Sequence, residues 1–189
     1  SSNAQIINNI ISGEEAAGIA NGLFCMDSSP LVLNNLIFGG FAPSCYAVNI
    51  GSPILPSTPT IDNNIIIGGP NGWGIYVADL NSDPSTIRHN DIFDCPNGFY
   101  YDPNVVALYD IPSIEALDPA NYYGNVSFEP VFANPSEGDV HLTSSSPMEV
   151  REGGLDGSAL GWPYNTDLEG RARTGNGSTG WSMGPYEYD

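Results

Sequence analysis

Apolar and polar residues recur in a fixed order along the first hundred positions of the chain. Each unit has an isoleucine or valine and, three positions later, an asparagine. The aligned asparagines are Asn9, Asn35, Asn64 and Asn90, at intervals of 26, 29 and 26 residues. A second isoleucine follows each asparagine by two positions, at Ile11, Ile37, Ile66 and Ile92. A period of this length predicts a solenoid in which every unit forms one coil.

The residues around these columns indicate β-strands. β-Branched side chains alternate with polar ones, and glycine, asparagine and proline bound each run. We predict strands at 5–7, 31–33, 60–62 and 86–88, and a second strand in each coil at 23–26, 45–48, 75–78 and 99–101. The units are too short for a helix in every crossover. The sequence therefore predicts an all-β parallel β-helix whose coils stack about 4.8 Å apart.

The asparagine column has a structural role in such a stack. A side-chain amide both donates and accepts hydrogen bonds, so identical asparagines in successive coils can bond to one another. We therefore expect Asn9, Asn35, Asn64 and Asn90 to form an inward-facing ladder. Asparagine also tolerates the left-handed backbone of a sharp corner.

Two sets of motifs carry a family resemblance. The motif Ser-Ser-Pro-x-x-x-Asn-Asn-x-Ile-x-Gly at 28–39 and Gly-Ile-Tyr-Val at 74–77 resemble the repeat of right-handed parallel β-helix proteins, the pectate-lyase-like superfamily. This resemblance covers residues 2–102. The segments 124–132, 138–142, 145–147 and 183–188 are similar to the closing segment of secreted bacterial and archaeal β-helix proteins, although 148–153 departs from that pattern. The resemblance implies a right-handed solenoid in an extracellular or cell-surface protein.

The repeat stops after residue 102, which predicts one domain with two parts. Residues 1–102 form the coils, and residues 103–189 form an irregular, loop-rich C-terminal closing or capping segment of the same domain. Residues 2–6 align with 28–32 in the middle of a repeat. We therefore expect the coils to be the C-terminal part of a longer solenoid.

The charge of the chain limits its partners. With 22 acidic residues, four arginines and no lysine, the net charge is −18, which disfavours nucleic acid and anionic lipid surfaces. No apolar run approaches the ~18 residues of a membrane-spanning helix, so we expect no membrane insertion. A solvated acidic surface is the simpler explanation of the charge, and cation binding is the alternative.

Asp79, Asn81 and Asp83 are the candidate ligands for a cation. They place side-chain oxygens at alternate positions of a turn, as a calcium site requires. However, Pro84 stands where a calcium loop has glycine, and Asn90 stands where it has a bidentate glutamate. Aspartate and asparagine are also common turn residues. The sequence favours a plain turn without a cofactor, with calcium as the alternative.

An aromatic column is the candidate ligand surface. Strict alternation along the second strands points Phe24, Tyr46, Tyr76 and Tyr100 outward, one in each coil. Regularly spaced aromatic faces suit the stacking of sugar rings. The alternatives are that residues 103–126 cover this column, or that the rings only stabilise the sheet.

Catalytic residues are harder to find. Lyases of the resembled fold use calcium on an aspartate cluster with a lysine or arginine base, and Arg88 is the only arginine of the coils. Arg88 aligns beside Asp62 of the preceding coil, which predicts a surface ion pair. Asp62 and Asp91 could supply the two carboxylates of a hydrolase, but nothing in the sequence selects them.

These observations favour a non-catalytic β-helix module with a structural or adhesive role, one that binds carbohydrate or assembles with itself. We expect a polysaccharide or another protein as its partner, or end-to-end self-association. The alternative is a polysaccharide lyase or glycoside hydrolase whose catalytic coils lie here or upstream.

The three cysteines are expected to remain thiols. Alternation points Cys25 and Cys45 inward in different columns, beside Val77 and Ile75 respectively, too far apart for a disulfide. Cys95 precedes a proline and is expected near the surface.

Overall fold

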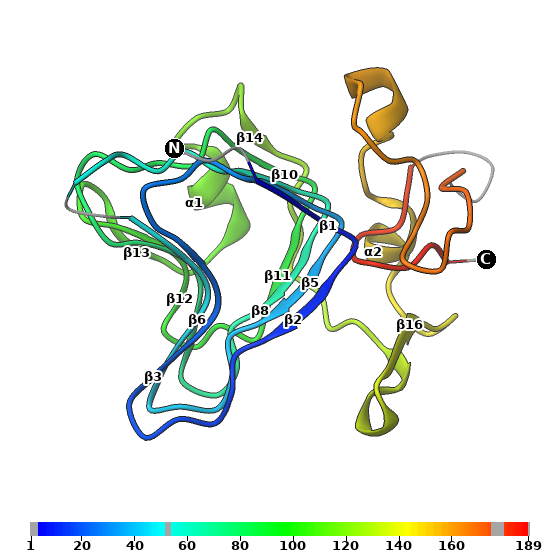
Figure 1. Cartoon of the computed structure of the whole chain (residues 1–189), viewed down its shortest axis with the longest axis horizontal. Helices are drawn as coiled ribbons and strands as arrows, with labels where there is room; N and C mark the ends of the chain where they lie inside the picture. The colour runs from blue at the N-terminus through cyan, green and yellow to red at the C-terminus, as the bar shows by residue number, and fades with distance from the viewer. Residues whose placement is uncertain (1–3, 52–53, 175–179, 189) are drawn as a thin grey trace.

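The computed structural model describes residues 4–51, 54–174 and 180–188. Its first part is a stack of coils in which strands of successive coils pair in parallel (Figure 1). The first sheet consists of β1 (Gln5–Ile7), β4 (Leu31–Leu33), β7 (Thr60–Asp62), β10 (Thr86–Arg88) and β14 (Tyr122–Tyr123). The first four have the bounds that the sequence predicts, so the parallel β-helix is confirmed.

Each coil contains three strands, whereas the sequence predicts two. The second sheet consists of β2 (Ile10–Ser12), β5 (Leu36–Phe38), β8 (Ile65–Ile67) and β11 (Asp91–Phe93). Two residues separate each of these strands from the first sheet, and the first of the two adopts a left-handed backbone, with φ of 56° at Asn34 and 57° at Asn63. Asparagine tolerates this conformation. The isoleucine that follows each asparagine therefore belongs to a new strand beyond a tight corner.

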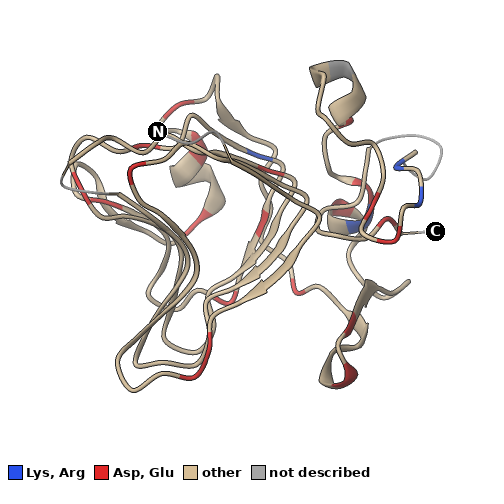
Figure 2. Ribbon diagram, in the orientation of Figure 1, with Lys and Arg blue, Asp and Glu red and all other residues tan. Residues whose placement is uncertain are grey.

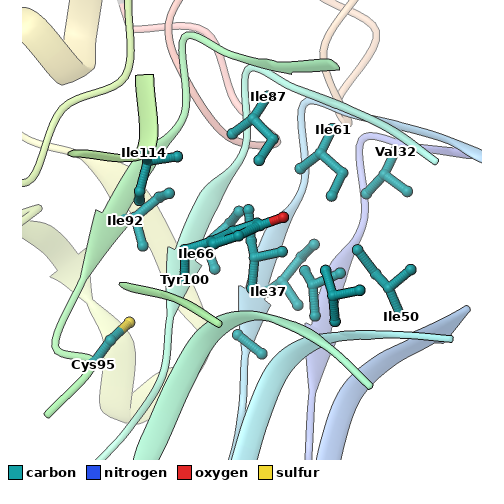
Figure 3. Packing of buried hydrophobic residues seen from close by; sticks show 14 of the residues in the cluster. Val32, Ile37, Ile50, Ile61, Ile66, Ile87, Ile92, Cys95, Tyr100 and Ile114 are labelled. Atoms are coloured by element: carbon teal, nitrogen blue, oxygen red, sulfur yellow. The ribbon is translucent and has the colours of Figure 1, made fainter. Parts of the chain in front are cut away.

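The third sheet is longer than expected. It consists of β3 (Ile19–Cys25), β6 (Ser44–Ile50), β9 (Gly72–Val77) and β12 (Gly98–Asp102), and β13 (Val106–Leu108) pairs antiparallel with β12. The three sheets enclose one column of apolar side chains. The isoleucines and valines of the first and second sheets face Tyr100 and Ile50 of the third (Figure 3). No coil could bury this surface alone, so the coils stabilise one another.

A hydrogen-bonded ladder runs through the stack. The backbone nitrogen and Nδ2 of Asn64 both donate to Oδ1 of Asn90, at 2.9 and 3.0 Å. Asn9 donates to Asn35 and Asn35 to Asn64 in the same way. Asn90 donates likewise to Asn125, which extends the four predicted rungs by one. From Asn35 to Asn90, every rung therefore accepts from the preceding coil and donates to the following one.

The short helix α1 (Ile111–Glu115) closes the far end of the ladder. Its Glu115 accepts from the backbone nitrogen of Asn125 at 2.8 Å and from Nδ2 at 3.4 Å, in the place of a further asparagine. Ile114 of the same helix is fully buried in the core. Asp110 caps the N-terminus of the helix, where its Oδ1 accepts from the backbone nitrogen of Ser113 at 2.8 Å.

The rest of the C-terminal segment lies along the side of the coils (Figure 1). It contains β15 (Phe132–Asn134), β16 (Asp139–Leu142), α2 (Met148–Glu152) and the short 3-10 helices Pro135–Glu137 and Gly157–Leu160. Val150 and Met183 bury Leu36 and Ile65 on the outer face of the second sheet. The segment expected to cap the coils is therefore divided: residues 103–126 close the end, and the following residues cover a flank.

The corner asparagines hold this flank in place. Asn63 donates to the carbonyl oxygen of Leu155 and accepts from its backbone nitrogen, at 2.9 and 2.8 Å. Arg173, which is almost fully buried, donates to Oδ1 of Asn8 at 3.0 Å and lies 3.4 Å from Oε2 of Glu187. Polar side chains at the corner thus provide the hydrogen-bond partners that the backbone of this irregular segment does not find in a sheet. Within the described residues, no helix is both long and apolar enough to cross a membrane.

Removing the terminal acceptor should destabilise the whole stack. In Glu115→Ala, the backbone nitrogen of the nearly buried Asn125 loses its acceptor, whereas Nδ2 keeps its bond to the carbonyl oxygen of Ile87, and the loss costs about 1–3 kcal/mol. Glu115→Gln keeps an acceptor oxygen and should remain close to the parent. Urea unfolding measures both, and equal losses in the two variants would show that Glu115 does not act as the last rung.

Candidate functional site

Among the described residues, the outer face of the third sheet carries the largest group of aromatic side chains in contact with one another. Two columns point outward: one contains Asn21, Tyr46, Trp73 and Gly98, and the other contains Phe24, Asn49, Tyr76 and Tyr101. In Figure 1 the strands of this sheet bow toward the inside of the coil, so its outer face is concave.

Small residues between the two outward columns explain this bend. A Cβ at Gly74 would come within 2.7 Å of Cγ2 of Ile92, and one at Gly22 within 2.9 Å of Cγ2 of Ile37. The isoleucines belong to the second sheet, so the two sheets approach too closely here for larger side chains. The strand bends at this column, and the outward positions on either side are three residues apart instead of two.

Four rings from three coils make up what we call the aromatic patch: Tyr46, Trp73, Tyr76 and Tyr101. Tyr76 is at its centre, with ring centroids 4.7 Å from Tyr46, 5.5 Å from Trp73 and 4.6 Å from Tyr101. Trp73 and Tyr101 are also in contact, at 5.4 Å. All four side chains are partly exposed. Aromatic pairs at these distances attract by about 0.5–1.5 kcal/mol each beyond their buried area.

The indole of Trp73 lies over the neighbouring coil. A Cβ at Gly98 would be 2.6 Å from Cζ3 and 3.0 Å from Cε3 of Trp73, so the six-membered ring occupies the space that a side chain would fill. Gly98 also has a φ of 145°, which other residues rarely adopt. The glycine thus allows the indole to lie against the sheet.

The polar groups of this face are uncharged. Nδ2 of Asn49 donates to Oδ1 of Asn21 at 2.8 Å. Burial raises the pKa of Tyr76, and the neighbouring phenols of Tyr46 and Tyr101 raise it further. The Tyr76 phenol is therefore neutral at physiological pH and can donate as well as accept a hydrogen bond.

The expected column of Phe24, Tyr46, Tyr76 and Tyr100 is wrong in its register. Tyr100 points into the core and is fully buried, and Phe24 pairs with Asn49 rather than with Tyr46. The prediction assumes that every second residue points outward. At the bend, successive outward positions are instead three residues apart. Trp73 and Tyr101 take the outward places, and only Tyr46 and Tyr76 of the expected set belong to the aromatic patch.

Tyr100 has a polar partner inside the coil. Its hydroxyl donates to Oδ1 of Asp83 at 3.1 Å, and the hydroxyl of Tyr122 donates to the same oxygen at 3.0 Å. Burial raises the pKa of Asp83, whereas these two hydrogen bonds lower it. Asp83 therefore links β12 and β14 through these two hydrogen bonds.

Two of the candidate calcium ligands, Asp79 and Asp83, accept hydrogen bonds from different parts of the chain. Oδ1 of Asp79 accepts from the backbone nitrogens of Asn81 and Ser82 at 2.8 and 3.0 Å, which is a local turn. Asp83 accepts from the two tyrosines instead. No group of three or more His, Cys, Asp or Glu side chains suited to a metal occurs among the described residues. Asp79 and Asp83 thus bond to different groups, and calcium binding at this turn stays a prediction.

Asp62 and Arg88 form an ion pair that is more buried than the sequence suggests. Nη2 of Arg88 lies 2.6 Å from Oδ2 of Asp62, and Nε donates to both carboxylate oxygens at 3.2 Å. Thr86 also donates to Asp62. The Asp62 side chain is fully buried, so the expected surface pair is wrong on this point. Thr86 and Arg88 of the next coil both bond to the Asp62 carboxylate, so the stacking of coils buries this side chain.

Asp91 lies on another sheet and is covered by the chain around residues 126–128. Oδ1 accepts from the backbone nitrogen of Phe128 at 2.9 Å, and buried Oδ2 has no hydrogen-bond partner among the described residues. Burial raises the pKa of this carboxyl to about 7. Asp62 and Asp91 therefore do not form the catalytic pair that the sequence left open.

The sequence was compared with models of known protein families. The family model described as a right-handed β-helix region matches residues 1–104. The chain belongs to this right-handed β-helix family. No curated protein and no solved structure matches the chain.

The β-helix register also decides the environment of the cysteines. Cys25 shares its column with Ile50 and Val77 as expected, but Cys45 pairs with Ala20 and Gly72 rather than lying beside Ile75. The expectation that Cys95 lies near the surface is wrong, because its side chain fills the space beside Gly68 and Gly74. All three are buried free thiols, and burial raises the pKa of Cys25 and of Cys95 to about 12.

The buried carboxyl of Asp91 should make the β-helix less stable as pH rises. Its pKa is higher in the folded chain than the ordinary value of 3.8, so the folded state retains the proton longer. The contribution is complete below about pH 4 and is lost by about 1.4 kcal/mol per pH unit as pH rises toward 7. Urea unfolding between pH 5 and pH 8 measures this loss.

Asp91→Asn should remove most of the loss, because the amide stays neutral in both states. Asp94→Asn is the matched control, since it removes one charge from an exposed position three residues away. If the parent and Asp91→Asn showed the same pH dependence, Asp91 would not be the titrating group.

Proposed function

We propose that this β-helix is a non-catalytic, extracellular or cell-surface module that binds carbohydrate through the aromatic patch. One observation carries the proposal: four rings from three successive coils contact one another on the outer face of a continuous sheet. Solvent reaches all four, and in Figure 1 no segment of the chain runs across the concave side of β6 and β9.

The chemistry of the patch suits sugar rings. Apolar C–H groups of a pyranose can lie against aromatic faces, while its hydroxyls need neutral donors and acceptors at the edge. The phenols of Tyr46, Tyr76 and Tyr101 supply such groups on this face. The rigid repeat sets the rings in place before a ligand arrives, which lowers the entropic cost of binding.

The outer face of the first sheet supports a non-catalytic role. Its acid and base, Asp62 and Arg88, neutralise each other, and both are held by short hydrogen bonds. Beside them, hydroxyls bond from coil to coil, as between Thr60 and Ser85 at 3.1 Å. Such a surface is suited to holding the stack together, whereas a lyase or hydrolase requires an acid or base that can exchange protons with a substrate.

End-to-end assembly is not part of the proposal. At the far end, β13 runs antiparallel to β12, and α1 covers the last coil with Ile114 and Glu115. Because β13 ends the third sheet in the antiparallel direction, the first coil of a second copy could not continue that sheet in parallel. An adhesive role would therefore use the side of the β-helix.

Replacing Trp73 tests the proposed surface. Trp73→Ala removes the ring that lies against the sheet and should weaken binding to a polysaccharide about tenfold or more, which corresponds to about 1.4 kcal/mol. Tyr164→Ala, at an exposed tyrosine of the C-terminal segment, is the control and should bind like the parent. Affinity electrophoresis in gels containing soluble polysaccharides gives the affinities.

The same samples test the alternative function. Release of reducing ends, or absorbance from unsaturated products, would reveal hydrolase or lyase activity and contradict the proposal. Equal affinities of the parent and Trp73→Ala would place any carbohydrate site elsewhere on the β-helix. Circular dichroism of each variant verifies that it is folded.

A further inference from the structure

We propose that the aromatic patch selects glycans without acidic groups, and that its ligand is a neutral polysaccharide. This inference rests on the proposed carbohydrate-binding function and adds the class of sugar. It follows from the distribution of charge around the third sheet.

The positive charges of the chain lie away from the patch. Arg88 is on the first sheet and is paired with Asp62. Arg151, Arg171 and Arg173 belong to the C-terminal segment on the far side of the second sheet, as the blue positions in Figure 2 show. A uronic acid or sulfated sugar would therefore find no guanidinium partner on the third sheet, although such pairs are the usual means of binding carboxylate and sulfate.

Negative charges flank the same face. Glu14 and Glu15 precede the first strand of the third sheet and are exposed. Asp27 and Asp79 follow the strands β3 and β9 at the opposite corner. In Figure 2 acidic positions occur on the turns at both ends of these strands, as they do elsewhere on the chain. Together with a net charge of −18, they repel an anionic chain before it reaches the rings.

The rings themselves favour uncharged ligands. The face of an aromatic ring carries partial negative charge, so it attracts C–H groups and cations and repels anions. The raised pKa of Tyr76 leaves its hydroxyl free to donate to a sugar oxygen. Neutral donors and acceptors on a stacking surface match the hydroxyls of a neutral sugar without requiring a counter-ion.

A cationic amino sugar is the alternative ligand that this acidic surface could attract. Its attraction would come from the flanking carboxylates and would weaken as salt rises, because the Debye length falls from about 10 Å at 0.1 M to about 3 Å at 1 M. Stacking of a neutral sugar on Tyr76 and Trp73 does not depend on these charges. Salt therefore separates the two sources.

The experiment compares three polymers at low and high salt with the full chain. The probes are a neutral glucan or mannan, polygalacturonate and chitosan, each tested by affinity electrophoresis or by pull-down on insoluble polymer. We expect the neutral polymer to bind at least tenfold more tightly than polygalacturonate, with little effect of salt. Trp73→Ala should lose this binding, and Tyr164→Ala should retain it.

Each other outcome contradicts a different step. Binding of polygalacturonate as tight as that of the neutral polymer would overturn the selectivity and leave the proposed function standing. Binding of chitosan alone, lost at high salt and unchanged in Trp73→Ala, would show attraction by the acidic turns and overturn the inference. No binding of any polymer across a wide panel would overturn the proposed carbohydrate-binding function itself.

Discussion

The asparagine ladder is the interaction on which the rest of the structure depends. Each amide donates through its backbone and side chain to the next coil, and Nδ2 of Asn64 also reaches the carbonyl oxygen of Val32. A slip of one residue in any coil would leave these buried donors and acceptors without partners, which is costly in a core of low polarity. The ladder therefore fixes the register of all three sheets, and Glu115 completes it with an acceptor that has no donor of its own.

From this register follows the surface that we propose as functional. Because the coils cannot shift, the rings of β6, β9 and β12 keep their relative places along the stack. The close approach of the third sheet to Ile37 and Ile92 bends it, and the bend turns Tyr46 and Tyr76 toward a shared concave face. A structural constraint in the core thus shapes the candidate site on the outside.

The sequence predicts the architecture well because its columns report directly on stacking. The strands around Ile61 and Ile87 and the ladder at Asn64 follow from the period alone. The outward residues of the third sheet were harder to predict. A two-residue pattern assumes that every second side chain points outward, whereas at the bend near Gly74 successive outward positions are three residues apart. The burial of Asp91 could not be predicted either, because the chain at Val126 and Phe128 that covers it does not repeat.

The location of ligand binding is the most direct test of this account. Backbone amide shifts of the labelled protein can be followed by NMR during titration with a neutral oligosaccharide. We predict shifts concentrated in β6, β9 and β12, around Tyr46, Trp73 and Tyr101, with the ladder amides unchanged. Shifts concentrated on the first sheet around Thr60 and Arg88 would contradict the account, because they would place the site on the face that we assign to structure alone.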